Sequence, residues 1–158
     1  MKNLWAPWRA DYILSPKAGE CVFCLGGPAE DAERQVLYRG CECFVIMNKY
    51  PYSNGHLMVA PYAHVSELVA LPENTLTELI LLVRRSASVL KKHFLAQGMN
   101  IGINIGEAAG AGVSDHLHCH LVPRWTGDSN FMTVFADVRT ISQHLHETYL
   151  ALNPYFKE

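Results

Sequence analysis

The chain has 158 residues, of which 49% are hydrophobic, so it is long enough for one ordinary domain with a buried core. Its formal net charge of −2 and its pI near 6.4 argue against a broad basic surface for duplex nucleic acid. A phosphate ligand must therefore be held by a small local site, and we expect no nucleic-acid partner.

The N-terminal residues lack the features of a targeting segment. There is no apolar run of signal-peptide length, and no later stretch is apolar enough to cross a bilayer. Residues 1–19 carry aromatic side chains among prolines without a clear period, which predicts a docking arm ahead of one domain over residues 20–158. Five cysteines form an odd set, typical of free thiols or a metal site in a reducing compartment. We expect a cytoplasmic protein without membrane contact.

Short apolar runs and one long amphipathic segment predict the elements of the first two thirds of the chain. Residues 36–48 are expected to form a strand or hairpin, and His56–Ala60 a second strand that ends at Pro61. Pro72–Gln97 predicts a long helix with acidic residues near its start, basic residues near its end and Gly98 as terminator. Its apolar stripe consists of Leu76, Leu79, Ile80, Val83, Ala87, Leu90 and Phe94.

A hairpin and a terminal helix are predicted for the rest. Asn100–Gly106 alternates between isoleucines, expected to pack on the core, and small polar residues that leave room. The loop Glu107–Asp115 then leads into a histidine segment, so a hairpin would bring Asn104 close to the histidines. Ser142–Leu152 is predicted to be a helix.

Three histidines, His116, His118 and His120, alternate after this loop. A period of two places their rings on one face of a strand. Polar rings on a buried face need partners, such as phosphate oxygens, a metal or one another. Neutral imidazole, with an ordinary pKa of about 6.5, is a good nucleophile toward phosphorus near neutral pH. His118, held between two neighbours, is the best placed for this attack.

The loop before the histidines is built from glycine and alanine over residues 106–113. Without large side chains, its backbone amides can approach phosphate oxygens and stabilise charge that develops at phosphorus. The pattern predicts a phosphate cradle next to the nucleophile.

Together these residues resemble the histidine triad (HIT) family of nucleotide hydrolases and transferases. The resemblance covers about residues 20–135 and rests on the following motifs: Asn104-x-Gly106, Ala109-Gly110, His116-x-His118-x-His120-x-x-Pro123-Arg124, residues 44–48, residues 51–60 with Gly55-His56, and Pro61-x-x-His64. It implies an α+β fold with a mainly antiparallel five-stranded sheet and two main helices. It also implies a homodimer paired through the long helix and a shared sheet.

The resemblance assigns roles to single residues. It makes His118 the nucleophile on the α-phosphate of a nucleotide or dinucleoside polyphosphate, supported by His120 and His56. Asn48 matches a ribose-binding position, and Asn104 matches the asparagine on the phosphate side. The other residues it implies in nucleotide or phosphate binding are Phe44 and Ile46 near the base pocket, and Gly110, Gly112, Val113, Ser114, Trp125 and Asn130.

One departure concerns the acceptor of the transfer. Most family members carry Gln and then Ser or Thr where this chain has Gly112 and Val113, so help for the leaving group is expected from Ser114, loop amides or an ordered water. The loop variant and the residues after the triad resemble a bacterial branch that includes diadenosine tetraphosphate phosphorylases. That branch uses inorganic phosphate as acceptor and yields ATP and ADP, which makes Trp125 and Asn130 candidates for contacts to the polyphosphate or second nucleoside.

Three alternatives stay open. Hydrolysis of dinucleoside polyphosphates or nucleoside phosphoramidase activity shares the triad chemistry, since the acceptor depends on loop detail. A nucleotide-binding module without turnover is a non-enzymatic alternative, because the usual Gln and Ser are missing. A nucleic-acid repair factor is disfavoured, because no basic arm follows the triad.

The motif Cys21-x-x-Cys24 can present two thiolates to one zinc ion, although a structural site needs two further ligands. In zinc-bearing relatives, these resemble His64 and His116. Such a zinc would be structural and would attach the N-terminal segment to the catalytic strand. No organic cofactor is expected.

Two alternatives to this ligand set stay open. One is a set that uses Cys41 and Cys43, whose side chains would point to the same face of a strand. The other is that no metal is bound. Outside a metal site, Cys41, Cys43 and Cys119 are expected to be buried and inert.

Overall fold

The computed structural model describes residues 21–128 and 143–157. The predicted docking arm and Asn130 lie outside the described residues, as does the first residue of the predicted terminal helix, Ser142.

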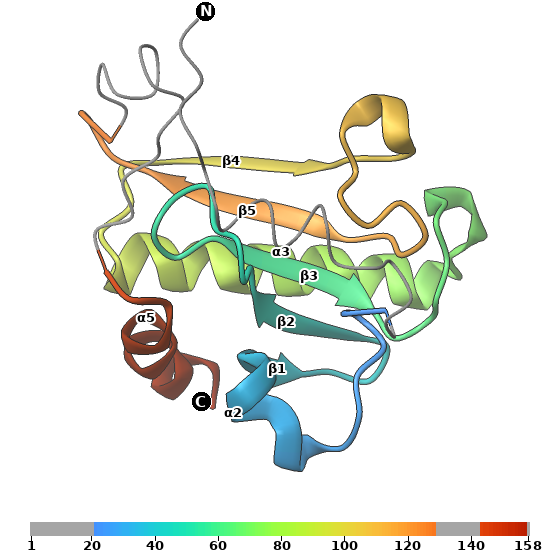
Figure 1. Cartoon of the computed structure of the whole chain (residues 1–158), viewed down its shortest axis with the longest axis horizontal. Helices are drawn as coiled ribbons and strands as arrows, with labels where there is room; N and C mark the ends of the chain where they lie inside the picture. Colours follow the sequence, from blue (N-terminus) through green and yellow to red (C-terminus); the bar gives the residue numbers. More distant parts are fainter. Residues whose placement is uncertain (1–20, 129–142, 158) are drawn as a thin grey trace, which may run out of the picture.

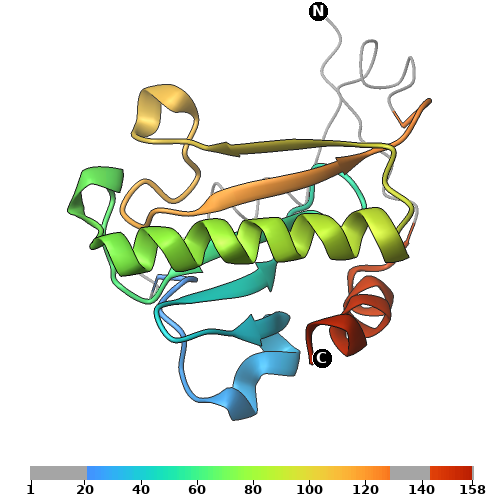
Figure 2. The same cartoon turned by 180° about the vertical axis from the view of Figure 1, so that it is seen from behind.

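Five antiparallel strands form one sheet in the order β1-β2-β3-β5-β4, with the long helix α3 across one face (Figures 1 and 2). The strands are β1 (Val36–Arg39), β2 (Cys43–Met47), β3 (Leu57–Pro61), β4 (Gly98–Ile103) and β5 (Cys119–Arg124). The α-helices are α2 (Asp31–Arg34), α3 (Glu73–His93) and α5 (Leu145–Leu152). Short 3-10 turns are η1 (Pro28–Glu30), η2 (Leu68–Ala70), η3 (Glu107–Ala109) and η4 (Asn153–Phe156). The predicted α+β fold with a five-stranded antiparallel sheet is confirmed.

The sheet buries apolar side chains on both faces. Between the sheet and α3 lies the first core cluster, whose members include Cys43, Val45, Met47, Leu57, Val59, Leu79, Leu90, Leu117, Cys119 and Leu121. On the opposite face lies the second core cluster of Phe23, Val36, Phe44, Ile46, Met58 and Ala60. Because β2 and β3 are buried on both faces, they are apolar throughout, which is why short apolar runs were a sufficient signal for them.

Helix α3 ends earlier than its sequence predicts. It stops at His93, and the amides of Phe94 and Ala96 both donate to the carbonyl of Leu90. This C-terminal cap requires a left-handed residue, which is Leu95 with φ of 52°. Gly98 is therefore not the terminator, and it begins β4 instead.

The buried face of α3 also differs from the predicted stripe. Its buried residues are Thr75, Leu79, Leu82, Val83, Ser86, Val89 and Leu90. Ile80, placed in the stripe by its hydrophobicity, is 60% exposed. The two polar residues Thr75 and Ser86 take places on the buried face that a hydrophobic pattern does not assign to them.

Strand β4 begins and ends before its predicted range. Two of the isoleucines expected to pack on the core are largely exposed, Ile101 at 49% and Ile105 at 38%, whereas Ile103 packs against the first core cluster. For Ile101 the reason is that β4 is an edge strand, whose outer side pairs with no other strand among the described residues; Ile105 lies beyond the end of β4.

The terminal helix α5 begins at Leu145 and packs beside β1, where the hydroxyl of Tyr149 donates to the carbonyl of Val36. Its two neighbouring histidines, His144 and His146, are exposed as solvated side chains. Within residues 21–128 and 143–157, no helix has the length and apolarity needed to span a membrane.

Candidate active site and metal centre

The register of the sheet brings the end of the triad together with the strand predicted to line the base pocket. His120 pairs with Met58 of β3 and with Gly102 of β4, and Met58 pairs with Ile46 of β2. Directly paired residues in antiparallel strands point to the same face. The paired residues Ile46, Met58, His120 and Gly102 therefore lie on the face of the sheet opposite α3. That face is turned toward the viewer in Figure 1.

The histidine segment alternates as predicted, although only His120 lies inside a strand. Leu117 and Cys119 belong to the first core cluster on the α3 side, so the histidines between them point to the other side. Strand β5 begins at Cys119, and before it the amide of Leu117 donates to the carbonyl of Val65 at 2.6 Å. The three histidines thus share a face, but His116 and His118 lie ahead of the strand.

His118 has a single tautomer assigned by its partner. Its Nδ1 lies 2.8 Å from the backbone carbonyl oxygen of His116. A carbonyl can only accept, so Nδ1 carries the hydrogen and Nε2 of the neutral ring keeps a free lone pair. This is the nitrogen that a nucleophilic histidine needs.

His120 has the opposite tautomer, set by a chain of hydrogen bonds from the β2–β3 turn. The backbone amide of Tyr52 donates to His56 Nδ1 at 3.1 Å, so the hydrogen of neutral His56 lies on Nε2. That Nε2 lies 3.0 Å from His120 Nδ1, which therefore accepts. Neutral His120 carries its hydrogen on Nε2 as a result. Nε2 of His118 therefore offers a lone pair, whereas Nε2 of the neighbouring His120 offers a hydrogen.

Burial keeps these rings neutral near pH 7. Desolvation lowers the pKa of His118, although the hydrogen bond to the carbonyl of His116 opposes this shift. Desolvation and the nearby His118 lower the pKa of His120 to about 4. The rings of His118 and His120 meet edge to face with centroids 4.7 Å apart, so a second positive charge there would be unfavourable.

The residues expected to bind the base and ribose lie on or next to the same face. Phe44 and Ile46 are buried in the second core cluster. Asn48 follows β2, and its Oδ1 accepts from the amide of Tyr50 at 2.9 Å. That bond fixes the amide so that Nδ2 points at His56 Nδ1, 3.3 Å away. Asn48 is therefore part of the hydrogen-bond chain behind His120.

The predicted phosphate loop lies between β4 and the triad. Asn104 follows β4, and continuing the β4–β5 register by one residue places it opposite His118. Gly110 has a φ of 80°, a left-handed conformation that favours glycine. Val113 packs against the second core cluster, and Ser114 Oγ donates to Asp115 Oδ1 at 3.1 Å. Gly112, in the same loop, is exposed.

Trp125 is not brought to the triad of its own chain. It lies seven residues beyond His118, about 23 Å along an extended strand. Its Nε1 donates to the carbonyl of Leu95 at 3.1 Å, at the end of the sheet where α3 ends. A contact between Trp125 and the polyphosphate bound in the same protomer is therefore disfavoured.

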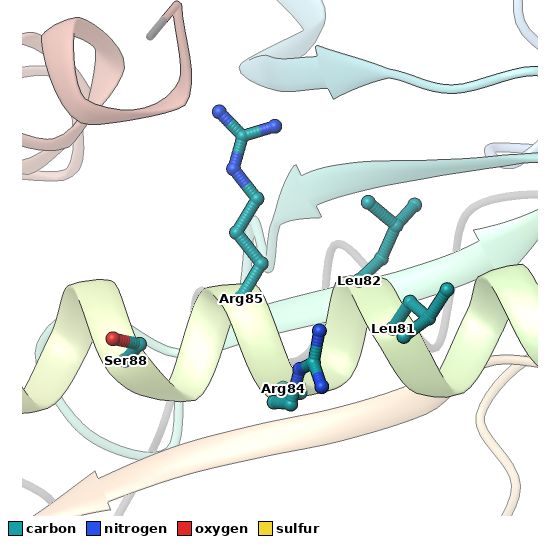
Figure 3. A pocket seen from close by; sticks show the side chains of 5 residues that line it. All are labelled: Leu81, Leu82, Arg84, Arg85 and Ser88. Atoms are coloured by element: carbon teal, nitrogen blue, oxygen red, sulfur yellow. The ribbon is translucent and has the colours of Figure 1, made fainter.

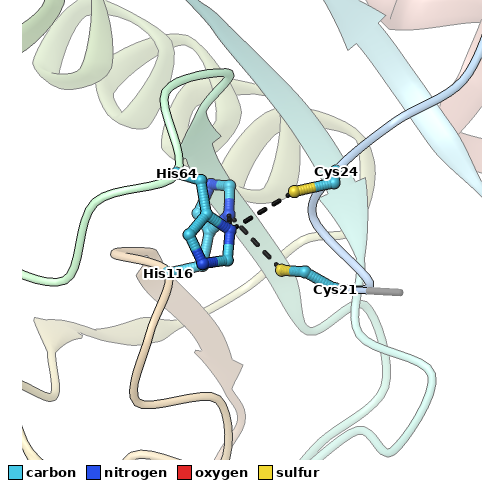
Figure 4. A group of neighbouring side chains, drawn as sticks. All are labelled: Cys21, Cys24, His64 and His116. Atoms are coloured by element: carbon cyan, nitrogen blue, oxygen red, sulfur yellow. Dashed lines mark hydrogen bonds between the residues drawn. The ribbon is translucent and has the colours of Figure 1, made fainter. Parts of the chain in front are cut away.

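The four predicted metal ligands, Cys21, Cys24, His64 and His116, form one group, with ligand atoms all within 4.8 Å of one another (Figure 4). Cys21 Sγ and His64 Nδ1 lie 3.4 Å and 3.3 Å from His116 Nδ1, and Cys24 Sγ lies 3.3 Å from His64 Nδ1. A tetrahedron with metal–ligand bonds of about 2.0–2.3 Å has edges of about 3.3–3.8 Å. The spacing of these atoms fits such a centre.

The tautomer of His116 also fits a metal ligand. Its Nε2 lies 2.8 Å from the carbonyl oxygen of Pro61, so Nε2 carries the hydrogen and Nδ1 presents its lone pair to the group. Burial lowers the pKa of His116, which favours the neutral ring that a metal requires. Cys24 and His64 are exposed, and they line a surface hollow of about 570 Å³ together with Glu30 and Arg34.

The competing ligand set does not form. Cys41 is exposed in the turn before β2, which corrects the expectation that it is buried. Cys43 is buried, and its Sγ lies 3.6 Å from the carbonyl oxygen of Thr75. Desolvation raises the pKa of Cys43 to about 12 and that of Cys119 to about 11, so both are inert thiols, as expected. Among the described residues, neither belongs to a group that could hold a metal.

Two residues of the site were not singled out from the sequence. Phe23 stacks on His118 with ring centroids 4.6 Å apart, and Tyr52 lies against His56 and His120 at 4.8 Å and 6.0 Å. A lone buried phenylalanine and a turn tyrosine carry no pattern of their own. The only sequence signal for Phe23 is its place between two cysteines.

The comparisons agree with this geometry. The HIT domain model matches residues 29–127. The chain belongs to the HIT domain family. It is 36% identical to an AP-4-A phosphorylase of Mycobacterium tuberculosis over 157 residues, covering 94% of this chain and 80% of that relative. It is 35% identical over 120 residues to an asymmetrical bis(5'-nucleosyl)-tetraphosphatase of Schizosaccharomyces pombe, covering 75% of this chain and 65% of that protein.

Solved structures of HIT proteins resemble it as well. A Zn-bound histidine triad family protein from Mycobacterium smegmatis has a TM-score of 0.67 and 27% identity, covering 87% of this chain and 94% of that one. A hypothetical histidine triad nucleotide-binding protein from Sulfolobus tokodaii has a TM-score of 0.65 and 30% identity, covering 87% and 89%. The membership in the HIT family predicted from the triad is confirmed.

Proposed function

We propose that this HIT protein cleaves dinucleoside polyphosphates, diadenosine tetraphosphate foremost, by nucleotidyl transfer through His118 to inorganic phosphate. The observation that carries the proposal is the pair of opposite tautomers, with a free lone pair on His118 Nε2 beside a hydrogen on His120 Nε2. A nucleophile and a hydrogen-bond donor to the departing oxygen are two groups that assist an in-line displacement at phosphorus. The AP-4-A phosphorylase relative, which is similar along nearly the whole chain, supports this substrate class.

The reaction proceeds in two balanced steps. In the first, His118 Nε2 forms a bond to the α-phosphorus, the bond to the bridging oxygen breaks, and ATP leaves with help from the His120 Nε2 hydrogen. In the second, a phosphate oxygen attacks the phosphorus of the nucleotidyl-His118 intermediate. The P–N bond then breaks, which releases ADP and restores neutral His118. The loop with Gly110, Gly112, Val113 and Ser114 contributes backbone amides toward the phosphates, and Asn104 lies on the same side.

Nucleoside binding is assigned to the face of β2. Phe44 and Ile46 supply apolar surface for the base, and Asn48 supplies an amide for the ribose. Asn48 is half-buried, and its amide is already oriented by the backbone of Tyr50, so little ordering is needed when a ligand binds.

The test is to incubate the protein with diadenosine tetraphosphate with and without phosphate. We expect ATP and ADP in the presence of phosphate only. ATP and AMP without phosphate would instead establish hydrolysis, the second candidate, which the similarity to the Schizosaccharomyces pombe tetraphosphatase supports. His118→Ala should abolish turnover, whereas His146→Ala, which changes an exposed histidine of α5, should not. Tight nucleotide binding without turnover would show a binding module instead.

We also propose that Cys21, Cys24, His64 and His116 hold a structural zinc ion. The tetrahedral spacing of the four ligand atoms and the tautomer of His116 support this, as does the Zn-bound Mycobacterium smegmatis neighbour. When bound, zinc would supply a crosslink between the N-terminal segment and the start of the triad, because four protein ligands close its coordination. Metal analysis should find about one zinc per chain, and Cys21→Ala should lose it. A native protein that folds without metal contradicts the proposal.

A homodimer through α3 and the β4 edge is the assembly we propose. Ile80 and Ile101 are exposed apolar residues on these neighbouring elements, and α3 carries a surface hollow of about 540 Å³ (Figure 3). The residues that line this hollow are Leu81, Leu82, Arg84, Arg85 and Ser88. Light scattering should give twice the chain mass, and Ile101→Glu should give a monomer. A monomeric wild-type protein would rule the assembly out.

Such a dimer would give Trp125 a role that its own chain does not. Two β4 edges paired about a two-fold axis run antiparallel. The end of one sheet that carries Trp125 then meets the end of the partner's sheet that carries the triad. Asn130 lies outside the described residues, and its contact to the polyphosphate or second nucleoside stays a prediction from the family resemblance. Substrates bound across two protomers suit a molecule with a nucleoside at each end.

A further inference from the structure

Phe23 is a buried side chain on an otherwise exposed turn. The turn is closed by a hydrogen bond of 2.9 Å from the amide of Cys24 to the carbonyl of Cys21. Within it, Val22 is 57% exposed, whereas Phe23 is only 1% exposed and belongs to the second core cluster. The two cysteines therefore belong to the group of four metal ligands, which we call the metal group. Phe23, between them, packs into the face of the sheet that carries the histidines.

The ring of Phe23 contacts two members of the triad. Its centroid lies 4.6 Å from that of His118 with an interplanar angle of 30°, and 5.3 Å from that of His116 with an angle of 47°. These are the distances of favourable aromatic pairs. The stacked pair with His118 is the closer of the two.

Besides Phe23, one hydrogen bond and one ring contact restrain the imidazole of His118 in the described part of the chain. Its Nδ1–H bond to the carbonyl of His116 fixes one edge of the ring, and the ring of His120 meets it edge to face at 4.7 Å. A single hydrogen bond leaves the plane of a ring free to tilt about the bonded edge. A flat surface against one face of the ring removes this tilt, and Phe23 provides that surface.

We propose that Phe23 is a positioning residue that transmits the geometry of the Cys21–Cys24 turn to the nucleophile His118. The proposal rests on the proposed function of His118. Two of the contacts on the His118 ring, with the carbonyl of His116 and with the ring of Phe23, come from segments that carry three of the four metal ligands, Cys21, Cys24 and His116. The group of four metal ligands is thereby connected to the His118 ring at two points, at its Nδ1 edge and at one of its faces.

The expected consequence is a loss of rate rather than of substrate affinity. A tilt of the imidazole moves Nε2 away from the line of attack on phosphorus, and a misplacement of about 1 Å can cost about 100-fold in rate. Substrate binding through the loop amides and the β2 face does not depend on that line. Phe23 should therefore influence kcat much more than KM.

The variant that tests this is Phe23→Leu, which keeps an apolar side chain but removes the flat surface. With diadenosine tetraphosphate and phosphate, we expect kcat to fall by about 10- to 100-fold and KM to stay within about threefold. Metal analysis should give the same zinc content as wild type, since the four ligands are unchanged. In ¹⁵N NMR spectra, the protonated Nδ1 and bare Nε2 signals of His118, distinct in wild type, should broaden or move toward each other.

Two matched controls separate positioning from general destabilisation. Val22→Ala changes the exposed residue of the same turn, and Val36→Ala removes buried apolar volume from the same cluster on β1, separated from β5 by β2 and β3. Both should keep kcat within about twofold. Wild-type kcat in Phe23→Leu, an equal loss in Val36→Ala, a rise in KM alone, or a loss of zinc would each overturn the proposal.

The same experiment distinguishes this proposal from the proposed function. If wild-type protein turns over no dinucleoside polyphosphate, the function fails. The ¹⁵N spectra of wild type and Phe23→Leu still decide whether Phe23 fixes the His118 ring, because that comparison needs no substrate.

Discussion

At the scale of single residues, four histidines with the same side chain differ in role because each ring nitrogen has a different partner. A backbone carbonyl takes the Nδ1 hydrogen of His118, and another takes the Nε2 hydrogen of His116. A backbone amide instead donates to His56 and so sets the tautomer of His120 two hydrogen bonds away. The main chain, rather than any charged side chain, decides which ring nitrogen carries the hydrogen and which keeps a lone pair, and the proposed roles follow from that.

Ser86 is the residue at which packing and polarity conflict most directly. Its side chain is fully buried on α3, and Oγ has no hydrogen-bond partner in the described part of the chain. A buried hydroxyl without a partner costs about 1–3 kcal/mol, and alanine is also the better helix former. We therefore expect Ser86→Ala to raise the free energy of unfolding by about 1–2 kcal/mol, measured by urea denaturation at one protein concentration.

The control is Thr77→Ala, on the exposed side of the same helix, where the hydroxyl already donates to the carbonyl of Glu73. It gains only the difference in helix propensity, about 0.5 kcal/mol. Equal stabilisation by the two substitutions would mean that the Ser86 hydroxyl is satisfied and that only propensity matters.

At the scale of elements, the C-terminus of α3 shows why helix ends are hard to place from sequence. Gly98 is the conventional terminator, but the left-handed residue is Leu95, whose side chain is 74% exposed and whose carbonyl accepts the Trp125 indole hydrogen. The contact that favours this turn comes from a residue thirty positions away. No local pattern contains it.

Leu95→Gly should stabilise the protein. The left-handed conformation costs a residue with a Cβ about 1–2 kcal/mol relative to glycine, and glycine keeps the carbonyl that Trp125 needs. After the larger entropy loss of glycine, a net gain of about 1 kcal/mol in the free energy of unfolding is expected. Lys92→Gly, in the last turn of the same helix, should instead lose about 1 kcal/mol. Destabilisation by both substitutions would refute this explanation of the helix end.

The sequence predicts which helices and strands are present better than it predicts where each begins and ends and which of its side chains are buried. Strands β2 and β3 follow from unbroken apolar runs, and the triad face follows from strict alternation at His116, His118 and His120. The buried face of α3 does not follow, because Thr75 and Ser86 are polar. The exposure of Ile101 follows only from the position of β4 at the sheet edge, which is a property of the topology. The positioning contact of Phe23 depends on a turn 95 residues away from His118 in the chain.

At the scale of the whole molecule, the two faces of the sheet carry different groups of residues. The α3 face holds the first core cluster, and the opposite face holds the histidines, the second core cluster and the metal group. The central strands supply both faces, so the site is built directly on the most buried part of the sheet. This arrangement gives the triad rigid support and also desolvates its rings.

That desolvation links the stability of the molecule to pH. The folded-state pKa of His120 is about 4, and that of His118 is also lowered, whereas an unfolded histidine has a pKa of about 6.5. Between pH 6.5 and 4, the unfolded chain binds more protons than the folded one, so stability is full above 6.5 and falls as the pH drops through this window. Urea denaturation of wild type at pH 7.5 and 5 should show this loss.

His120→Asn isolates the contribution of one ring, because its side-chain oxygen can still accept from His56 Nε2 but cannot titrate in this range. We expect the loss of stability between pH 7.5 and 5 to be smaller in this variant than in wild type. His146→Asn, which removes an exposed histidine of α5 far from the triad, is the matched control and should retain the wild-type loss. Identical pH dependence in wild type and His120→Asn would show that the acid sensitivity comes from other groups. A smaller dependence in His120→Asn alone would mean that the proposed active site also limits the acid stability of the fold.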